Sequence, residues 1–351
     1  MPQRPTLVMD VMGGDLGVAE MLRGVSDFCD VMSGSEFDLA VVHSVPDEIE
    51  ALREHMPRSI FSSQTHSIRF VEAPDVVPRE FSSPVDAFKK YPRSSIRVSM
   101  EIAKEHPRSV VVSPGTTGLV MTAGLFTLGR VAGIDRPPIG TPLPTHKGDM
   151  WFVDGGSNVD CKPMHLHQFA ILAHLFVKTL YGKQRPSIAL LSNGTEDYKG
   201  NTLVKEARAL IEADPNLNCV GYVEGHSLFD GDVDIMVCDG FLGNITLKLA
   251  EGVGTFMTDT LRSAIKRSPI AAIAAKLFLR SALREIHTRT DYAQWGGAPL
   301  LGLKDNVIIC HGRSNALAIR NALKVGFELS RKDLVHEVEE MMAGYKVRTG
   351  E

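Results

Sequence analysis

The sequence predicts an α/β protein built on a mainly parallel, doubly wound sheet. Short segments rich in Val, Ile and Leu alternate along the chain with longer segments of helical periodicity, which is the pattern of repeated βαβ units. Several of the short segments are almost continuously apolar, as strands are when helices cover both faces of their sheet. Strands are expected at nine segments, residues 5–11, 37–43, 67–73, 108–114, 150–156, 187–193, 218–224, 234–240 and 306–312.

Helices are expected between many of these strands. The clearest helical patterns lie at residues 95–106, 117–130, 164–181, 202–213 and 314–330. The chain has 351 residues, which is enough for one large domain with a substantial core. We therefore expect a single α/β domain over residues 1–351, with a helical excursion at residues 249–292.

The composition excludes several classes of protein. A content of 44% hydrophobic and 23% charged residues is typical of a soluble globular enzyme, and a net charge of −4 is too small to indicate nucleic-acid binding. The five cysteines are scattered without a C-x-x-C pair, which argues against disulfides and a zinc site and favours a reducing compartment. Neither a signal peptide nor a membrane-spanning segment is apparent, so we expect a cytoplasmic protein.

Six of the expected strands end on glycine beside small polar or charged residues. One such end is usually a turn, because Asp, Asn and Gly are common there. Ligands of parallel sheets bind beyond the carboxyl ends of the strands, so six ends converging on one edge of one sheet favour a binding site. The ends carry Asp10, Gly13, Gly14 and Asp15; Ser113, Gly115 and Gly118; Asp154, Gly155, Gly156, Asn158 and Asp160; Glu196, Lys199 and Gly200; Asp239, Gly240, Gly243 and Asn244; and His311, Gly312 and Asn315.

The segment "SPGTTG" (113–118) is the best candidate for a phosphate cradle. Gly115 and Gly118 allow close approach of the backbone, and the start of the following helix favours an anion. The hydroxyls of Thr116 and Thr117 lie between these glycines. The sequence has no Walker A loop and no G-x-G-x-x-G after the first strand, which disfavours nucleotide hydrolysis and NAD binding. We expect no cofactor.

Three side chains at or near these ends, Lys199, Lys248 and His311, are able to neutralise a phosphate or protonate a leaving group. Taken singly, each lysine is more often part of a solvated helix face, and His311 is more often a hydrogen-bonded residue at a strand end. The aspartates at these ends are able to orient donors or act as a base, but no H-x-x-H or H-E-x-x-H pattern accompanies them, so we expect no metal. His165 and His167 fall on different sides of one helix and are interpreted as structural.

The segment 261–290 combines basic and apolar residues. It contains seven basic residues and a single acid, Glu285, and Lys276, Arg280 and Arg284 recur every four residues along one ridge of a helix. Such a helix suits an anionic membrane surface or a partner protein. Packing of a helical pair within a homodimer is an equally good interpretation.

Six motifs in order resemble the PlsX family of phosphate acyltransferases, which make acyl phosphate from acyl–acyl carrier protein and orthophosphate. The resemblance extends from about residue 6 to about residue 330, and "CDGFLGNITLK" is its most specific match. The chain departs from the family where "SAGNTGA" stands as "SPGTTGL": Thr116 replaces an asparagine, and Pro114 removes a backbone donor. The motifs are "LVMDVMGGD" (7–15), "DGGSNVDC" (154–161), "GTEDYKGN" (194–201), "VDIMVCDGFLGNITLKLAEG" (233–252), "WGGAPLLGL" (295–303) and "HGRSN" (311–315).

The resemblance implies a three-layer α/β/α fold akin to isocitrate dehydrogenase and phosphotransacetylase. It also implies a homodimer with a helical protrusion, loose membrane association, and a role in phospholipid synthesis beside a membrane-embedded glycerol-3-phosphate acyltransferase. Residues 261–290 fall where the family's protruding helices lie, so the resemblance favours the interpretation of this segment as a membrane contact.

We therefore expect acyl transfer from the carrier-protein thioester directly to phosphate, which binds between residues 113–118 and residues 239–244. Thr117, Asn244 and Lys248 are expected to hold the phosphate oxygens, while Asp239 organises the loop. Lys199 or His311 is expected to stabilise the thioester oxyanion or assist the leaving thiolate. The other residues expected to bind phosphate or substrate are Asp10, Gly13, Gly14, Asp15, Ser113, Gly115, Thr116, Gly118, Asn158, Asp160, Gly240, Gly243 and Asn315.

Two alternatives remain open at this point. One is a metal-dependent hydroxy-acid dehydrogenase on the related fold, which NAD(P)H formation would reveal. The other is a non-catalytic scaffold that holds acyl carrier protein at a membrane. Because the carrier is acidic, Arg93, Arg97, Lys276 and Arg280 are candidate contacts in either the enzyme or the scaffold.

Overall fold

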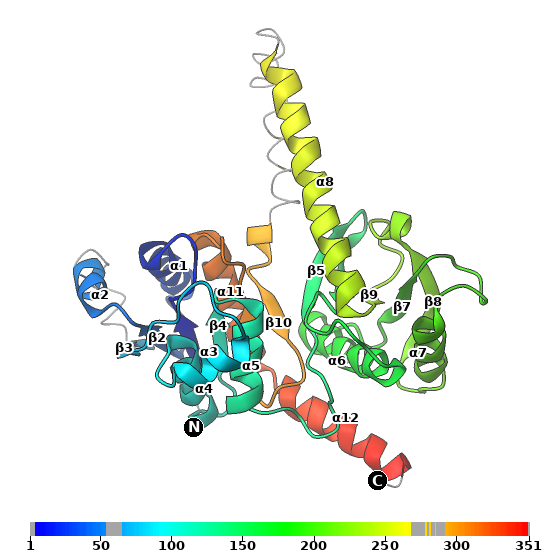
Figure 1. The fold of residues 1–351 in the computed structure, drawn as a ribbon, viewed down its shortest axis with the longest axis horizontal. Helices are drawn as coiled ribbons and strands as arrows, with labels where there is room; N and C mark the ends of the chain where they lie inside the picture. The colour runs from blue at the N-terminus through cyan, green and yellow to red at the C-terminus, as the bar shows by residue number, and fades with distance from the viewer. Residues whose placement is uncertain are drawn as a thin grey trace.

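The computed structural model describes residues 4–53, 65–267 and 292–349, with Phe278, Ser281 and Glu285 as isolated positions. Within these residues the strands form two sheets, one in each half of the molecule (Figure 1). The mainly parallel α/β class expected from the sequence is confirmed. The expectation of one sheet is wrong, because the strands are divided between two.

The first sheet has α-helices on both faces. Leu7 and Met9 point to the core beneath α1 (Val18–Val31) and α11 (Ala316–Arg331), whereas Val8 points to the core beneath α4 (Ser95–Glu105) and α5 (Thr117–Thr127). This alternation produces three layers. In spatial order the strands are β10 (Ala298–Leu300), β11 (Asn306–Ile309), β4 (Val110–Ser113), β1 (Thr6–Asp10), β2 (Phe37–His43) and β3 (His66–Glu72), and β10 alone is antiparallel.

The second sheet is built in the same way. Its Ile188, Leu190 and Val237 pack with α6 (Pro163–Tyr181) and α7 (Thr202–Glu212) on one face. On the other face Phe152 and Met236 pack with residues at the start of α8 (Gly240–Lys266). In spatial order the strands are β5 (Gly140–Thr145), β6 (Gly148–Val153), β9 (Ile235–Val237), β7 (Ser187–Ser192) and β8 (Asn218–Glu224), and β5 alone is antiparallel.

The two sheets meet at their antiparallel edges, β5 and β10. An isolated bridge pairs Ile139 with Leu300, and the N–H of Leu301 donates to the carbonyl of Pro138 at 2.9 Å. Neither edge strand was expected, because both "GTPLPT" and "APL" contain proline, which sheets tolerate mainly at their edges. All nine strands and five helices that were expected are present, with ends shifted by a few residues.

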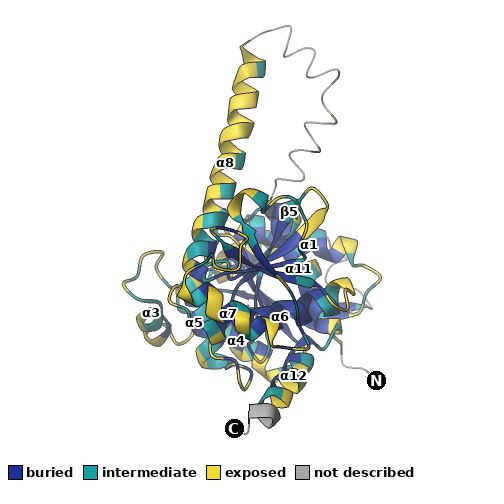
Figure 2. Ribbon diagram, turned by 90° about the vertical axis from the view of Figure 1, so that its right-hand side faces the viewer, coloured by how far each residue is buried: buried dark blue, intermediate teal, exposed yellow. Residues whose placement is uncertain are grey.

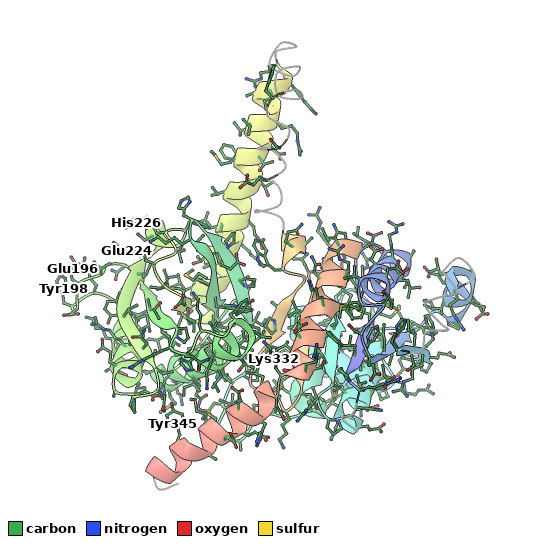
Figure 3. All side chains as sticks on the ribbon, turned by 180° about the vertical axis from the view of Figure 1, so that it is seen from behind. Glu196, Tyr198, Glu224, His226, Lys332 and Tyr345 are labelled. Atoms are coloured by element: carbon green, nitrogen blue, oxygen red, sulfur yellow. The ribbon has the colours of Figure 1, made fainter. Side chains whose placement is uncertain are left out.

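The C-terminal helix α12 (Leu334–Thr349) leaves the first half and runs beneath the second (Figure 3). Lys332 Nζ donates to the last carbonyls of α6, at Thr179 (2.8 Å) and Leu180 (3.1 Å). At the other end the Tyr345 hydroxyl donates to Asp214. The remaining elements are α2 (Pro46–Arg53), α3 (Pro84–Lys90) and the 3-10 turns η2 (Gly225–Ser227) and η3 (Tyr292–Gln294).

The buried Asp214 also accepts a hydrogen bond from Nε2 of His167 at 2.9 Å. His165 lies at the first turn of α6, where its Nδ1 accepts from the Lys162 N–H at 3.1 Å. Both histidines are buried and hydrogen-bonded within the protein. Their interpretation as structural residues is confirmed.

Helix α8 projects far from the body of the molecule and is exposed along most of its length (Figure 2). The expected helical protrusion is therefore present, although the helix begins at Gly240 rather than near residue 249. Apart from three isolated positions, residues 268–290 of the basic segment lie outside the described part of the chain. Among the described helices, none has the length and apolar character needed to cross a bilayer. The exposed apolar side chains of α8 are Phe241, Ile245, Leu249, Val253, Phe256, Met257 and Leu261.

Candidate active site

The first half of the candidate site is organised by a buried carboxylate, Asp10, at the end of β1. Its two oxygens accept from the Ser113 hydroxyl at 2.7 Å and from the Met12 N–H at 3.0 Å. Burial raises the pKa of Asp10 to about 6, against the opposing effect of hydrogen bonds from Ser113, Met12 and Ser95. Ser113 Oγ in turn accepts from the Gly115 N–H at 3.1 Å, so Asp10 fixes the loop that precedes α5.

The N-terminus of α5 is open to a ligand. Thr116 is the N-cap residue, but its side chain caps no backbone donor, and the hydroxyls of Thr116 and Thr117 lie on exposed residues. The N–H groups of Leu119 and Val120 both donate to the Thr116 carbonyl. Within the described part of the chain, the N–H groups of Thr117 and Gly118 have no acceptor. Unpaired amides at a helix start, together with the helix dipole, attract an anion.

Two glycines near α5 are needed for packing. Gly13 has φ +83°, and a Cβ there would stand 3.0 Å from the Cα of Gly115, so the loops after β1 and β4 touch. A Cβ on Gly118 would stand 2.9 Å from Cγ of Pro84, the first residue of α3. A Cβ on Gly14 would meet only side-chain atoms, 3.3 Å from Sδ of Met21 and 3.5 Å from Cγ of Pro114, so glycine is less strictly required there.

The end of β11 joins this half of the site. The Cys310 N–H donates to the Ser113 carbonyl at 2.8 Å, and the Asp15 N–H donates to the Gly312 carbonyl at 2.6 Å. His311 follows the end of β11, one residue beyond Cys310, which pairs with the start of the α5 loop, and its Nδ1 accepts from the Arg313 N–H at 3.1 Å.

Asn315 is the N-cap of α11, because its Oδ1 accepts from the Ala318 N–H at 3.0 Å. The Asp15 carboxylate lies 3.7 Å from Arg79. Both side chains thus have partners within the protein at the edge of this half of the site.

The second half of the site is organised by Asp154, which follows β6 and is completely buried. Its Oδ1 accepts from the N–H groups of Ile139 (3.0 Å), Gly156 (3.1 Å) and Ser157 (3.1 Å). Its Oδ2 accepts from the N–H (2.7 Å) and the side-chain amide (2.9 Å) of Asn158, and the Ser157 hydroxyl contacts both oxygens. The loop 154–158 is therefore wrapped around one carboxylate.

Helix α8 starts directly on this loop. Asp239 caps the helix by accepting from the Leu242 N–H at 2.9 Å. The Gly240 N–H donates to the Asn158 carbonyl at 2.8 Å. A Cβ on Gly240 would stand 2.7 Å from the Asn158 nitrogen, and one on Gly243 would overlap the Asp154 carbonyl oxygen. Glycine is required at both positions because the helix backbone lies against the loop.

Asn244 and Lys248 follow on the first turns of α8. A Cβ on Gly156 would stand 3.0 Å from Cβ of Asn244, so Asn244 lies beside the Asp154 loop. Within the described residues the Asn244 amide has no hydrogen-bond partner and the exposed Lys248 has no ion pair. The side-chain amide of Asn158, in contrast, donates to Asp154 at 2.9 Å and to the Pro137 carbonyl at 3.0 Å, so it is already engaged within the protein.

The remaining expected residues, Asp160 and Lys199, lie apart from these loops. The exposed Asp160 offers its backbone carbonyl to Arg136 at 2.7 Å. The loop after β7 that carries Lys199 reaches the outer edge of the second half, where Glu196 and Tyr198 are seen (Figure 3). The Lys199 ammonium lies 5.6 Å from the centre of the Tyr198 ring.

The six glycine-containing strand ends do not lie on one edge of one sheet. Those of β1, β4 and β11 belong to the first sheet, and those of β6, β7 and β9 belong to the second. In Figure 1 α5 lies beside β10, where the first half borders the second, and α8 rises from the second half. The expectation of a single sheet edge is corrected to two groups of three, because β5 and β10 separate the parallel strands.

Sequence reasoning noted Asp154 only as a strand end and did not assign it to the site. The pattern "DGGSN" was a usable signal, because Asp and Ser followed by main-chain donors commonly close a turn around a carboxylate. Its contact with Ile139 and the support that it gives to α8 depend on segments distant in sequence. Ser95 on α4 was missed for the same reason.

The fold is that of the phosphotransacetylases. A phosphotransacetylase from Streptococcus pyogenes matches with a TM-score of 0.61 at 16% identity, over 94% of this chain and 95% of that chain. A branched-chain phosphotransacylase from Enterococcus faecalis matches with a TM-score of 0.52 at 12% identity, over 92% of this chain and 99% of that chain. At such identities the likeness shows the fold alone, and it confirms the expected phosphotransacetylase-like architecture.

Sequence comparison defines the family. The model of the family described as "Fatty acid synthesis protein" matches residues 6–337. The phosphate acyltransferase of Pelotomaculum thermopropionicum is 37% identical over 342 residues, covering 97% of this chain and 96% of the relative. The phosphate acyltransferase of Geobacter sulfurreducens is 38% identical over 336 residues, covering 96% of this chain and 94% of the relative. The chain belongs to this family of fatty acid synthesis proteins, which confirms its resemblance to PlsX proteins and the expectation of an acyltransferase of lipid synthesis.

Proposed function

We propose that this protein transfers an acyl group from the thioester of acyl carrier protein to orthophosphate. A phosphate oxygen forms a bond to the acyl carbon, the carbon–sulfur bond breaks, and the carrier leaves as a thiolate that takes up a proton. The products are acyl phosphate and free carrier thiol. Family membership supports this reaction class, since the relatives are named phosphate acyltransferase.

The observation that carries the proposal is the open N-terminus of α5. Phosphate binds there to the N–H groups of Thr117 and Gly118 and to the hydroxyls of Thr116 and Thr117, with the helix dipole adding to the attraction. Asp10 is a positioning residue in this arrangement, because its enclosed carboxylate holds Ser113 rather than a ligand. Phosphate is already partly dianionic at neutral pH, so it attacks without a strong protein base.

The second half of the site supplies the side chains that complete phosphate binding. The amide of Asn244 and the ammonium of Lys248 have no partner within the described residues and are assigned to the phosphate oxygens. His311, which follows the end of β11 beside the α5 loop, is assigned to the oxyanion or the leaving thiolate. Lys199 remains the alternative for that role, although its loop extends outward.

The direct test is incubation of the protein with an acyl carrier protein thioester and labelled phosphate, followed by detection of acyl phosphate. Lys248→Ala is expected to raise KM for phosphate about 10-fold, the worth of one charge-assisted hydrogen bond. Lys205→Ala, on the exposed face of α7, is the matched control and is expected to leave KM unchanged. If Lys248→Ala and Lys199→Ala both retain wild-type activity, these assignments are wrong.

The carrier is proposed to dock on the basic face beside α5, formed by Lys89, Lys90, Arg93 and Arg97. Arg93 and Arg97 also pair with Asp75 (3.7 Å) and Glu101 (3.0 Å), whereas Lys89 and Lys90 have no acidic partner within the described residues. Lys276 and Arg280, the other candidate contacts, lie outside the described residues. Replacing Lys89 and Lys90 by Glu is expected to weaken carrier binding, and Lys205→Glu is the control with one reversed charge.

Helix α8 is proposed to contact a second copy of the chain and an anionic membrane surface. Its exposed apolar side chains recur every three or four residues from Phe241 to Leu261, which supports burial against a partner. Sedimentation at equilibrium is expected to give a dimer, and Phe256→Glu with Met257→Glu is expected to give monomers. Unchanged assembly of this double variant would place the interface elsewhere.

The cellular setting follows from the same proposal. The protein is cytoplasmic and loosely membrane-associated, and it delivers acyl phosphate to a membrane-embedded glycerol-3-phosphate acyltransferase. Both halves act together as one catalytic domain, because each supplies one side of the phosphate site. Co-sedimentation with vesicles containing anionic lipid tests the membrane contact. Equal binding to anionic and to neutral vesicles would contradict it.

A further inference from the structure

We infer that Asp154 is a positioning residue for phosphate, through which the loop 154–158 fixes the start of α8. The inference rests on the proposed function, because Asn244 and Lys248 of α8 are the phosphate ligands in that proposal. Asp154 itself touches no substrate. It acts by holding the backbone on which those two side chains are mounted.

The bonding around Asp154 is unusually complete for a carboxylate. The residue is fully buried, and in the described part of the chain no cation contacts it. Its two oxygens accept instead from main-chain N–H groups of Ile139, Gly156, Ser157 and Asn158, at distances from 2.7 to 3.1 Å. These donors converge only while both oxygens accept, so the shape of the loop depends on the carboxylate.

The loop transmits this shape to α8 by direct contact. The Asp154 N–H donates to the Cys238 carbonyl at 3.1 Å, and the Gly240 N–H donates to the Asn158 carbonyl at 2.8 Å. The first turn of α8 lies so close that a Cβ on Gly243 would overlap the Asp154 carbonyl. A shift of the loop therefore shifts the helix start, and Asn244 with it.

Asp154→Asn is the most selective disruption. The side chain keeps its size, but one oxygen becomes an NH₂ group that faces N–H donors in either orientation of the amide. A misplacement of about 1 Å can cost 10- to 100-fold in a reaction that depends on positioning. We expect KM for phosphate to rise about 10-fold or more, while KM for the acyl thioester stays within about 2-fold of wild type.

Asp234 provides a matched control in the same sheet. It precedes β9, at the end opposite to Asp154, and accepts from the Ser187 N–H at 2.9 Å and the Ser187 hydroxyl at 3.1 Å. It also pairs with Lys183. Asp234→Asn thus disturbs a comparable set of carboxylate hydrogen bonds in the sheet without affecting the loop under α8. We expect it to lower thermal stability but to leave KM for phosphate unchanged.

Asn158→Ala tests the same loop if Asp154→Asn fails to fold. It removes one donor to Asp154 and the contact with the Pro137 carbonyl, while the carboxylate and its main-chain donors remain. A smaller rise in KM for phosphate, about 3-fold or more, is expected from loosening of the same loop.

The second readout is stabilisation by inorganic phosphate alone, measured as the upward shift of the melting temperature with increasing phosphate. Wild type and Asp234→Asn are expected to show the shift, and Asp154→Asn is expected to need at least 10-fold more phosphate. Equal phosphate dependence in wild type and in the folded Asp154 and Asn158 variants would overturn the inference. The same loss in Asp234→Asn would also overturn it. Wild type that binds phosphate without making acyl phosphate refutes the proposed function instead.

Discussion

The Ser113 hydroxyl donates a 2.7 Å hydrogen bond to the buried carboxylate of Asp10, which joins the ends of β4 and β1. The same hydroxyl accepts from the Gly115 N–H, so the loop before α5 is held from both sides. A corresponding carboxylate, Asp154, holds the loop beneath α8. Each half of the candidate site is thus built around one buried aspartate at a strand end.

The ionisation of Asp10 is expected to make stability depend on pH. Its pKa is about 6 in the folded protein and 3.8 in the reference state, so between these values the folded protein binds more protons than the unfolded chain. Stability contributed by neutral Asp10 is therefore present below about pH 4 and is lost as the pH rises to about 6. The difference between these two pKa values corresponds to roughly 3 kcal/mol.

Asp10→Asn isolates this effect. The free energy of unfolding of the wild type is expected to fall relative to that of Asp10→Asn between pH 4 and pH 6, and to run parallel to it above pH 7. Urea unfolding at several pH values measures the difference. A difference that stays constant across this range would show that burial does not raise the pKa of Asp10.

Ser113→Ala is expected to destabilise the protein by about 1–3 kcal/mol, because the Gly115 N–H loses its acceptor and Asp10 loses a donor. It is also expected to weaken phosphate binding, since the loop before α5 is released. Thermal unfolding and phosphate titration measure the two effects. Ser263→Ala, on the exposed part of α8, is the control expected to change neither. An unchanged melting temperature in Ser113→Ala would argue against the Asp10 network.

Two glycines of α8 are expected to respond oppositely to alanine. Gly243→Ala places a Cβ on the Asp154 carbonyl and is expected to cost about 3 kcal/mol or more. Gly254→Ala, where a Cβ meets nothing within 4 Å, is expected to stabilise the helix by up to about 1 kcal/mol. Chemical denaturation of both variants compares them directly. A mild effect at Gly243 would mean that α8 does not lie against the Asp154 loop.

Tyr345→Phe is expected to destabilise the attachment of α12 by about 1 kcal/mol, because Asp214 loses one donor but keeps His167 and Asn216. Amide exchange along α12 should increase. Tyr198→Phe removes a hydroxyl that contacts Glu196 at 3.2 Å on an exposed loop, and it is expected to have no effect. Equal behaviour of the two variants would show that the Asp214 contact does not hold the helix.

The positions of the strands and helices were largely predictable, because apolar runs and helical periodicity reflect burial of local segments. β5 and β10 were not predicted, because their prolines are compatible with a strand only at the edge of a sheet. Which strands form an edge depends on strand pairing, which local sequence does not specify. The same pairing places the strand ends in two groups. The sequence pattern therefore identified the six strand ends but not their division between two sheets.

The sequence by itself determined the α/β class, the open helix start at "SPGTTG", and the cap and glycines that begin α8, since these depend on residues close together in the chain. Only the tertiary structure decided that Ser113 meets Asp10, that Ile139 meets Asp154, and that Gly243 must lack a side chain. Each of those contacts joins segments that become neighbours only when the sheets form. Local spacing specifies turns and helix ends, whereas the bonding of a buried carboxylate depends on what the whole fold places around it.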